Sequence, residues 1–198
     1  GKDLLVKALT ALNITPVTIQ AYNNDDKDYT GVITSLKQSG ADVMLSYMTL
    51  APDEGIFAKQ RKQQGLDIKW VGSASITAVA GRALAGEALY GTYGVADFHI
   101  DASETSKKFA AAYKAKYGKD PDYYAAWPYD AVYSFAEAMK KASSITPENI
   151  KNEMFNIKDF KGAEGTYSFD KNGDGLKHYH IVVNDNDVIK LQKTITVD

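Results

Sequence analysis

Residues 41–72 read ADVMLSYMTLAPDEGIFAKQRKQQGLDIKWVG. The stretch begins with a nearly continuous apolar run, Ala41 to Ser46, which favours a strand buried on both faces of a parallel sheet. An amphipathic helix is predicted from Pro52 to Gln64, and Gly65 suits its end because glycine adopts the left-handed conformation easily. A second, shorter strand is expected from Ile68 to Gly72. This order of strand, helix and strand predicts a right-handed βαβ unit and an α/β fold with a parallel sheet flanked by helices.

The same alternation continues on both sides of this unit. Apolar spacing and turn residues predict further elements there: a helix from Lys2 to Leu12, a strand from Pro16 to Tyr22, a helix around Val32 to Leu36 that stops at Gly40, an alanine-rich helix from Thr77 to Leu89, and a strand from Thr92 to Val95. Ligands of open α/β sheets bind at the carboxyl ends of strands. We therefore expect a site at Ser46 to Ala51 and at Ser73 to Ile76.

From Asp101 onward the elements become longer and resemble a second lobe. Three helices are predicted, Ser103 to Tyr117, Tyr123 to Ala142 and Pro147 to Asn156, followed by a strand within Gly162 to Asp170 and a closing hairpin of Leu176 to Val183 and Val188 to Val197. The run Asn184 to Asp187 consists of turn residues and joins the two hairpin strands.

Composition excludes several functional classes. With 198 residues, 44% hydrophobic and 24% charged, the chain can bury a core. A net charge of -2 and scattered lysines give no electrostatic footprint for nucleic acid or an anionic membrane. The absence of cysteine excludes thiolate chemistry and disulfides, and no apolar run is long enough to span a bilayer. Because the chain starts at Gly1, we expect that any signal peptide was removed or never included.

No motif in the sequence indicates catalysis, a metal or a cofactor. No nucleophile elbow, phosphate loop or dinucleotide fingerprint follows any strand. Asp170 to Gly175 imitates the start of a calcium-binding loop, but Ile181 stands where a glutamate is required, so a plain turn is expected. His178 and His180 share one face of a strand without a third ligand, which favours a solvated strand face over a metal site. An enzyme is therefore not expected.

Several stretches, taken in order, resemble one known family. They are DKDYT at 26–30, SGADV at 39–43, the Lys59-Gln60 pair before Gly65-Leu66, YDAV at 129–132 with Ala136 to Ala138, and GTYSFDKNGD at 165–174. Their order over almost the whole chain is similar to that of the branched-chain amino acid binding proteins of ABC transporters, which are type I periplasmic solute-binding proteins.

The resemblance implies a truncated two-lobe architecture. Family members are about twice as long, and this chain corresponds to the portion that follows the first strand of the second lobe. By this analogy the second lobe comprises residues 1–95 and 176–198, and residues 96–175 are the C-terminal part of the first lobe. The missing half would supply the small hydroxyl residues that hold a ligand carboxylate in the family. An exposed sheet edge left by the missing strand predicts a homo-oligomer.

The resemblance also implies which residues bind a ligand in the second lobe. The family's loop after the 41–46 strand matches Ser46, Tyr47, Met48, Thr49 and Leu50. Two interpretations of Tyr47 and Met48 stay open, because each side chain can contact a ligand or fill space at the end of the sheet. Two extra residues before Pro52 shift the spacing, so which of the five faces the cleft is also open.

The next loop departs from the family. Ser73, Ala74 and Ser75 match the place where amino acid binders carry an acidic residue that pairs with the ligand ammonium, and Ala74 stands at that position. Serine hydroxyls can form hydrogen bonds but supply no charge, and a buried cation without a partner is costly. A small aromatic or aliphatic carboxylate therefore competes with an amino acid as the ligand.

In the other lobe, Tyr124 matches an aromatic position that closes over the ligand, and Trp127 lies nearly one helical turn further on. Aromatic rings give a large contact area at low entropic cost. The alternative is a structural role, because the chain has 13 tyrosines. Pro128 either starts the helix or kinks it, and Tyr129 and Asp130 are expected to stabilise the helix and the lobe.

The function implied by the resemblance is capture of a small solute without chemistry. The partners would be an amino acid or small carboxylate and the membrane permease of an ABC transporter. The location would be periplasmic or extracellular, with a lipid anchor in a full-length protein. A ligand-sensing ectodomain of a receptor, which uses the same fold, is the other class that stays open.

Overall fold

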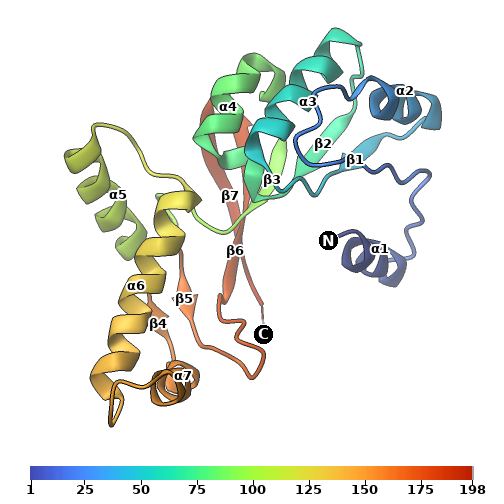
Figure 1. Ribbon diagram of the computed structural model, residues 1–198. Helices are drawn as coiled ribbons and strands as arrows, with labels where there is room; N and C mark the ends of the chain where they lie inside the picture. The colour runs from blue at the N-terminus through green and yellow to red at the C-terminus, as the bar shows by residue number, and fades with distance from the viewer. Residues whose placement is uncertain (198) are drawn as a thin grey trace. The chain divides into compact units, whose positions relative to one another are not determined.

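The computed structural model describes residues 1–197 and consists of helices and short strands (Figure 1). The helices are α1 (Lys2–Ala11), α2 (Thr30–Ser39), α3 (Ala51–Gln63), α4 (Val79–Ala85), α5 (Glu104–Tyr117), α6 (Tyr123–Lys141) and α7 (Pro147–Asn156), with the 3-10 helices η1 (Ala74–Thr77) and η2 (Gly86–Leu89). The strands are β1 (Val43–Leu45), β2 (Lys69–Gly72), β3 (Tyr93–Ala96), β4 (Phe160–Lys161), β5 (Thr166–Tyr167), β6 (His178–Asp185) and β7 (Val188–Thr196).

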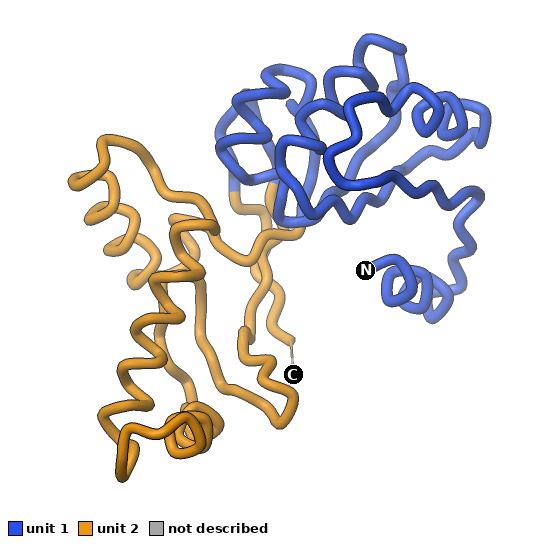
Figure 2. The backbone as a smooth tube through the Cα atoms, in the orientation of Figure 1, with its two compact units in different colours: residues 1–94, 183–190 blue, residues 95–182, 191–198 orange. Residues whose placement is uncertain are grey.

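Backbone contacts divide the chain into two compact units (Figure 2). Unit 1 comprises residues 1–94 and 183–190, and unit 2 comprises residues 95–182 and 191–198. The boundaries between the units fall inside β3, β6 and β7. Each unit therefore consists of segments that are distant in sequence.

The main sheet has the strand order β1-β2-β3-β6-β7. Strands β1, β2 and β3 are parallel, with Met44 opposite Trp70 and Val71 opposite Tyr93. Strands β6 and β7 form a hairpin, whose two connecting residues, Asn186 and Asp187, both have positive φ (52° and 68°). This pair of left-handed residues is typical of the tight turn that matches the twist of a hairpin. The sheet is thus mixed, with the predicted parallel part formed by the βαβ units.

The core of unit 1 lies between the sheet and the helices α2 and α3. Met44 and Trp70 point from neighbouring strands toward Phe57 on α3, whose ring lies 5.3 Å from that of Trp70. Helix α4 approaches α3 closely because both carry a glycine at the contact. A Cβ atom on Gly81 would lie 2.6 Å from a backbone oxygen of α3, and one on Gly55 would lie 2.7 Å from the Gly81 carbonyl.

Three expectations for unit 1 are wrong. Strand β1 is buried on one face only, because Val43 and Leu45 are 48% and 38% exposed. Pro16 to Tyr22 forms no strand; its β-branched residues have the propensity, but a strand also needs a paired neighbour. The helix expected over residues 77–89 is broken into α4 and η2, since Gly86 adopts a φ of 56° that ends α4.

Unit 2 is built around α6 and α7, which pack on each other and on the β4–β5 hairpin. One buried cluster of unit 2 contains Ala138, Ile150 and Ile157. The predicted α7 agrees with the structure at both ends, and Pro128 lies inside α6 rather than at its start. The strand expected within residues 162–170 is reduced to β5, which pairs with β4.

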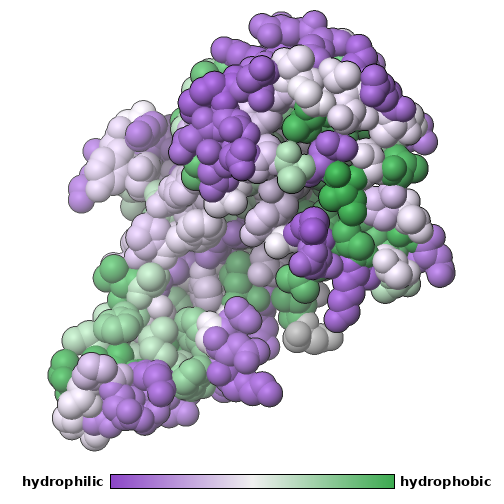
Figure 3. Space-filling view, turned by 45° about the vertical axis from the view of Figure 1, so that its right-hand side comes forward, coloured by the Kyte–Doolittle hydropathy of each residue, from purple (hydrophilic) through white to green (hydrophobic). Residues whose placement is uncertain are grey.

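Part of the surface of unit 2 is apolar. Figure 3 shows a largely hydrophobic region over the end of unit 2 that carries α6 and α7, and Val132 on α6 is 66% exposed. Among the described residues, no helix has the length and apolar character needed to cross a membrane.

Candidate functional site

The loops that follow β1 and β2 are joined by the side chain of Ser73. Its hydroxyl accepts a hydrogen bond from the Met48 backbone N–H at 3.2 Å and donates one to the Met48 carbonyl oxygen at 3.0 Å. The Ser75 hydroxyl lies 2.9 Å from the same Ser73 oxygen. The two segments predicted to bind ligand in unit 1 therefore form one hydrogen-bonded group at the carboxyl ends of two parallel strands.

Ser46 belongs to the same group. Its hydroxyl accepts a hydrogen bond from the Trp70 indole at 2.8 Å, and its backbone N–H bonds to Val71 on β2. The hydroxyl proton of Ser46 stays available for another acceptor. A ligand oxygen at this end of the sheet would find a donor whose position is fixed by the core tryptophan.

The other residues of the first loop differ in exposure. The side chain of Tyr47 is 64% exposed, whereas Met48 is 5% exposed and belongs to the core of unit 1. Thr49 donates its backbone N–H to the Tyr22 hydroxyl at 3.3 Å, and Leu50 is the residue that precedes the first turn of α3. In the described chain, Tyr47 and Thr49 are the loop side chains most open to a ligand.

Glu54 is an unpredicted member of this region. It is fully buried in the first turns of α3, and neither carboxyl oxygen has a hydrogen-bond partner of ordinary geometry among the described residues. Burial raises the pKa of Glu54 to about 8, opposed by the nearby Ser75 hydroxyl. Gly72 on β2 is adjacent, since a Cβ atom there would lie 2.8 Å from a Glu54 carboxyl oxygen.

The residues of unit 1 that are predicted to bind ligand therefore offer hydroxyl groups and backbone atoms but no acidic side chain. Ala74 carries no acid, and Glu54 is mostly protonated at neutral pH because its pKa is raised. A neutral carboxyl cannot balance a ligand ammonium as a carboxylate does. The structure thus agrees with the sequence that this end of the sheet lacks an acidic partner for the ammonium group of an amino acid ligand.

In unit 2, Tyr124 and Trp127 lie next to each other at the start of α6. They are 49% and 41% exposed, and both rings contact the buried Tyr123, at 4.3 Å and 4.6 Å between centroids. Asp122 begins the helix by accepting the backbone N–H of Tyr124. A short aromatic surface is therefore held in place by one buried ring and one capping carboxylate.

Trp127 also interacts with two carboxyl groups that the sequence did not single out. Burial raises the pKa values of Asp97 and Glu164, and hydrogen bonding from the Trp127 side chain opposes the rise in both. The pKa of Glu164 reaches about 7, and its Oε2 accepts a hydrogen bond from the Tyr167 hydroxyl. The aromatic residue predicted as a ligand clamp is therefore part of a buried acidic cluster.

Asp130 connects α6 to the loop between β4 and β5. Its two carboxylate oxygens accept the backbone N–H groups of Ala163 at 2.6 Å and Glu164 at 2.8 Å. Gly162 permits this approach, because a Cβ atom there would lie 2.3 Å from Asp130 Oδ2. The expected stabilising role of Asp130 is confirmed.

One expectation about histidine is wrong. His180 does not lie on a solvated face, since it is 2% exposed and its Nδ1 lies 3.1 Å from the Thr194 hydroxyl. Burial lowers the pKa of His180, which favours the neutral ring. The described residues contain no group of three metal-ligating side chains. Asp170 forms the predicted turn by accepting the backbone N–H groups of Asn172 and Asp174.

Comparison with known proteins defines the family. The sequence model described as periplasmic binding protein matches residues 1–185, and the chain belongs to that family. A curated Leu/Ile/Val-binding protein homolog of Brucella suis is 30% identical over 176 residues, which cover 87% of this chain and 46% of that protein. This confirms the resemblance seen in the sequence. The chain spans about half the length of the curated relatives it matches.

Solved structures agree on the fold. A leucine binding protein of Thermotoga maritima has a TM-score of 0.91 at 24% identity and covers 98% of this chain and 56% of its own. A branched-chain amino acid transporter substrate binding protein of Streptococcus pneumoniae, solved with isoleucine, has a TM-score of 0.76 at 26% identity over 89% of this chain and 50% of its own. The predicted α/β class with helices flanking the sheet is confirmed.

The sequence indicated the loops but not the buried acids. Glu54, Asp97 and Glu164 stand in stretches whose charge pattern is that of ordinary helix starts and loops. Only the contacts between separate segments show that Glu54 and Glu164 are buried and that the partly buried Asp97 lies near Glu164. The one available signal was Gly72, because a glycine at a strand end indicates a close approach by another group.

Proposed function

We propose that this protein is the solute-binding component of an ABC uptake transporter and that it captures a small ligand without changing it. The observation that carries the proposal is the hydrogen-bonded group formed by Ser73, Ser75 and the backbone of Met48 at the carboxyl ends of β1 and β2. Strand ends of parallel sheets are the common place for ligands in open α/β folds. Membership of the periplasmic binding protein family supports the same role.

The ligand we propose is a branched-chain or other amino acid. The curated relative from Brucella suis is named as a homolog of a Leu/Ile/Val-binding protein, and the Streptococcus pneumoniae protein was solved with isoleucine. Ser46, Tyr47, Thr49, Ser73 and Ser75 would contact it from unit 1. Met48, Leu50 and Ala74 would shape the same end of the sheet.

The second candidate is a small aromatic or aliphatic carboxylate. The observation that favours it is the lack of a fixed negative charge in this group, since Ala74 is neutral and Glu54 has a raised pKa of about 8. A carboxylate ligand needs hydrogen-bond donors and no partner for an ammonium. The Ser46 hydroxyl, which accepts from the Trp70 indole and keeps its own proton, supplies such a donor.

The wider assembly is part of the proposal. Residues 1–95 and 176–198 would form one lobe and residues 96–175 part of the other, with Tyr124 and Trp127 contributing aromatic contacts. The partner would be a membrane permease, and the location periplasmic or extracellular, as the family's description suggests. A lipid anchor in a longer parent protein belongs to the same hypothesis.

The proposal is tested by thermal unfolding of the chain with L-leucine, L-isoleucine, 4-methylpentanoate and benzoate. A ligand that binds only the folded state at a hundredfold excess over Kd stabilises it by about 2.7 kcal/mol. We expect either the two amino acids or the two carboxylates to raise the Tm of the chain. We expect mass spectrometry to detect no product from any of the four solutes. Ser73→Ala should reduce the shift, and the exposed Ser35→Ala on α2 should not. No shift with any solute, or consumption of one, would contradict the proposal.

A further inference from the structure

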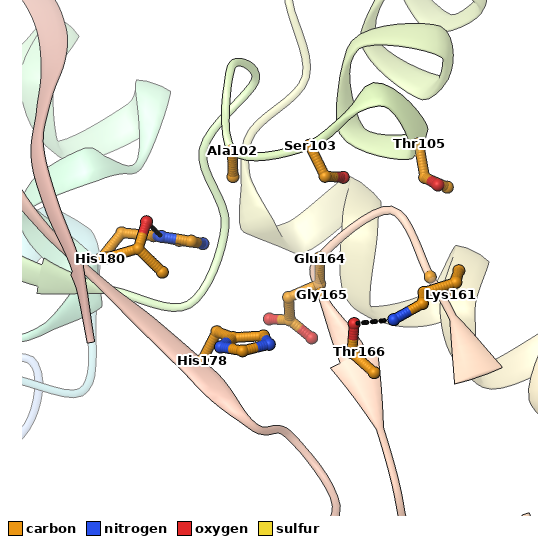
Figure 4. A pocket seen from close by; sticks show the side chains of 11 residues that line it. Ala102, Ser103, Thr105, Lys161, Glu164, Gly165, Thr166, His178 and His180 are labelled. Carbon is orange, nitrogen blue, oxygen red and sulfur yellow. Dashed lines mark hydrogen bonds between the residues drawn. The ribbon is translucent and has the colours of Figure 1, made fainter. Parts of the chain in front are cut away.

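Unit 2 contains a hollow that plays no part in the proposed solute site of unit 1. It has a volume of about 330 Å³ and lies between the start of α5, the β4–β5 hairpin and β6 (Figure 4). Its polar lining includes Ser103, Thr105, Lys161, Glu164 and His180. Small-molecule sites in proteins span about 300–1,000 Å³, so this hollow suits a ligand at the small end of that range.

Glu164 gives the hollow a built polar anchor. The residue is 4% exposed, and its carboxyl group points into the hollow toward β6 (Figure 4). Oε2 accepts from the Tyr167 hydroxyl, and the Trp127 side chain also interacts with this carboxyl group. Oε1 is buried with no hydrogen-bond partner of ordinary geometry among the described residues. A buried carboxyl oxygen without a partner costs on the order of 1–3 kcal/mol. A donor supplied by a ligand would remove that cost.

The surroundings of Glu164 favour a positive donor. Asp97 and Asp130 both raise the pKa of Glu164 through their negative charge, in addition to burial. His180 is biased toward its neutral form by burial. A ligand ammonium placed at Oε1 would therefore meet the Glu164 carboxyl group and the His180 ring at this end of the hollow.

The opposite end of the hollow favours a negative group. Helix α5 begins there with Ser103 as its cap, and Thr105 stands in its first turn. The N-terminus of a helix of this length, 14 residues, attracts anions through its free N–H groups and its dipole. Lys161 lines the same hollow and lies 3.1 Å from the Thr166 hydroxyl. Glu104, also in the first turn, is paired with Lys107.

We propose that this hollow binds a small zwitterion, whose ammonium is held by Glu164 and whose carboxylate is held by the start of α5 and Lys161. Both charged ends come from unit 2 alone. The site therefore goes beyond the proposed solute site of unit 1 and stands whether or not that proposal holds.

The charge of Glu164 sets the direction of the pH dependence. An ammonium binds the ionised carboxylate better than the protonated acid, and the pKa of Glu164 is raised to about 7. Affinity should therefore rise from about pH 6 to about pH 8 and level off above that range. The other groups that face Glu164 are Asp97, Asp130, Trp127, Tyr167, Tyr179 and His180, with His178 and Lys161 lining the same hollow. Burial lowers the pKa of His180, which favours its neutral ring.

The experiment follows backbone amide shifts of the ¹⁵N-labelled chain during titration with three probes of one shape: L-leucine, 3-methylbutan-1-amine and 4-methylpentanoate. We expect shifts at residues 103–105 and 162–166, with affinity highest for L-leucine. Glu164→Gln should lower the affinity for L-leucine, measured from the shifts at these residues, by about tenfold or more. The exposed Glu148→Gln at the start of α7 is the matched control and should leave the affinity unchanged.

A second variant keeps the test valid if Glu164→Gln fails to fold. Lys161 is exposed, so Lys161→Ala should fold. The substitution should weaken the affinity for L-leucine by about two- to fivefold and leave the affinity for 3-methylbutan-1-amine unchanged. Ser73→Ala in unit 1 should not alter these shifts, which separates this site from the proposed solute site. No shift at residues 103–105 and 162–166 with any probe, or equal affinity for Glu164→Gln and the parent chain, would overturn the proposal.

Discussion

Each unit buries a carboxyl group from a long helix, and the two are treated in opposite ways. Asp130 on α6 of unit 2 accepts two backbone N–H groups at 2.6 Å and 2.8 Å. Glu54 on α3 of unit 1 is equally buried but has no hydrogen-bond partner of ordinary geometry in the described chain. Asp130 therefore holds a loop in place. Burial of the Glu54 carboxyl group instead costs folding free energy, and the size of this cost depends on whether the group is protonated.

The difference shows how burial alone fails to define a role. A buried charge with several donors is a structural connection, whereas a buried acid whose burial outweighs one neighbouring hydroxyl gives up its charge. Burial raises the pKa of both groups, but only Asp130 has two backbone hydrogen bonds that oppose the rise. The predictions that follow test this contrast.

Asp130→Ala should produce the largest effect. The substitution leaves two buried N–H groups without an acceptor, and hydrogen bonds to charged groups contribute about 1.5–3 kcal/mol each, so we expect a loss of roughly 4 kcal/mol in the free energy of unfolding. Denaturant-induced unfolding measures it. The exposed Asp120, paired with Lys114, provides the control, since Asp120→Ala should cost less than about 1 kcal/mol. Similar losses of unfolding free energy for both variants would contradict the role of Asp130 in holding the β4–β5 loop against α6.

Glu54→Gln should change how stability depends on pH. The folded-state pKa of Glu54 is raised from 4.5 to about 8, so its contribution is fully present below about pH 4.5 and is lost as pH rises toward 8. The parent chain should lose up to roughly 3 kcal/mol relative to the variant between about pH 4.5 and pH 7.

The comparison for Glu54 rests on slopes rather than on absolute stabilities, because the buried amide of the variant adds a constant cost. Unfolding free energies of both proteins are measured across this pH range. The exposed Glu148→Gln should have the same slope as the parent chain. Parallel curves for the parent and Glu54→Gln would show that Glu54 is not protonated in the folded state.

The fold was largely predictable because it depends on patterns within single segments. The apolar run at 41–46, the helix ending at Gly65 and the strand before Gly72 lie near the observed β1, α3 and β2. The strand expected at Pro16 to Tyr22 failed, since pairing depends on a distant neighbour that local propensity does not reveal. The break at Gly86 also depends on a backbone conformation that the helical pattern conceals.

The site was predictable only in part. Ser73 and Ser75 were indicated by their place after a strand, and the structure joins them to the loop at Met48. Glu164 was not indicated, because its burial arises from α6, β5 and the segment around Asp97 together. His180 was misjudged for the same reason: alternation in a strand identifies a face but not what covers it.

Ser73→Ala should have a smaller effect than either buried acid. The hydroxyl connects two loops through Met48, and a neutral hydrogen bond contributes about 1 kcal/mol, so the expected loss is roughly 1–2 kcal/mol. Ser35→Ala, which removes an exposed hydroxyl on α2, should cost less than about 0.5 kcal/mol. If the two variants unfold at the same denaturant concentration, Ser73 does not hold the loops together.

The smallest effect is expected at a charged connection on the surface of unit 1. Arg82 on α4 reaches the turn between β6 and β7, where it donates to the Asp187 carbonyl at 2.6 Å and pairs with the Asp187 carboxylate. Arg82→Lys retains the charge but loses the fork of donors. The Arg82 side chain is 16% exposed and its partner Asp187 is 60% exposed, and ion pairs open to solvent contribute about 0.2–1 kcal/mol. We expect a loss below about 1 kcal/mol that shrinks in about 1 M NaCl, because salt screens exposed charges. The Asp130→Ala loss should persist at that salt concentration, since its partners are buried backbone groups. A salt-independent cost at Arg82 as large as that at Asp130 would mean that exposure does not separate the two kinds of connection.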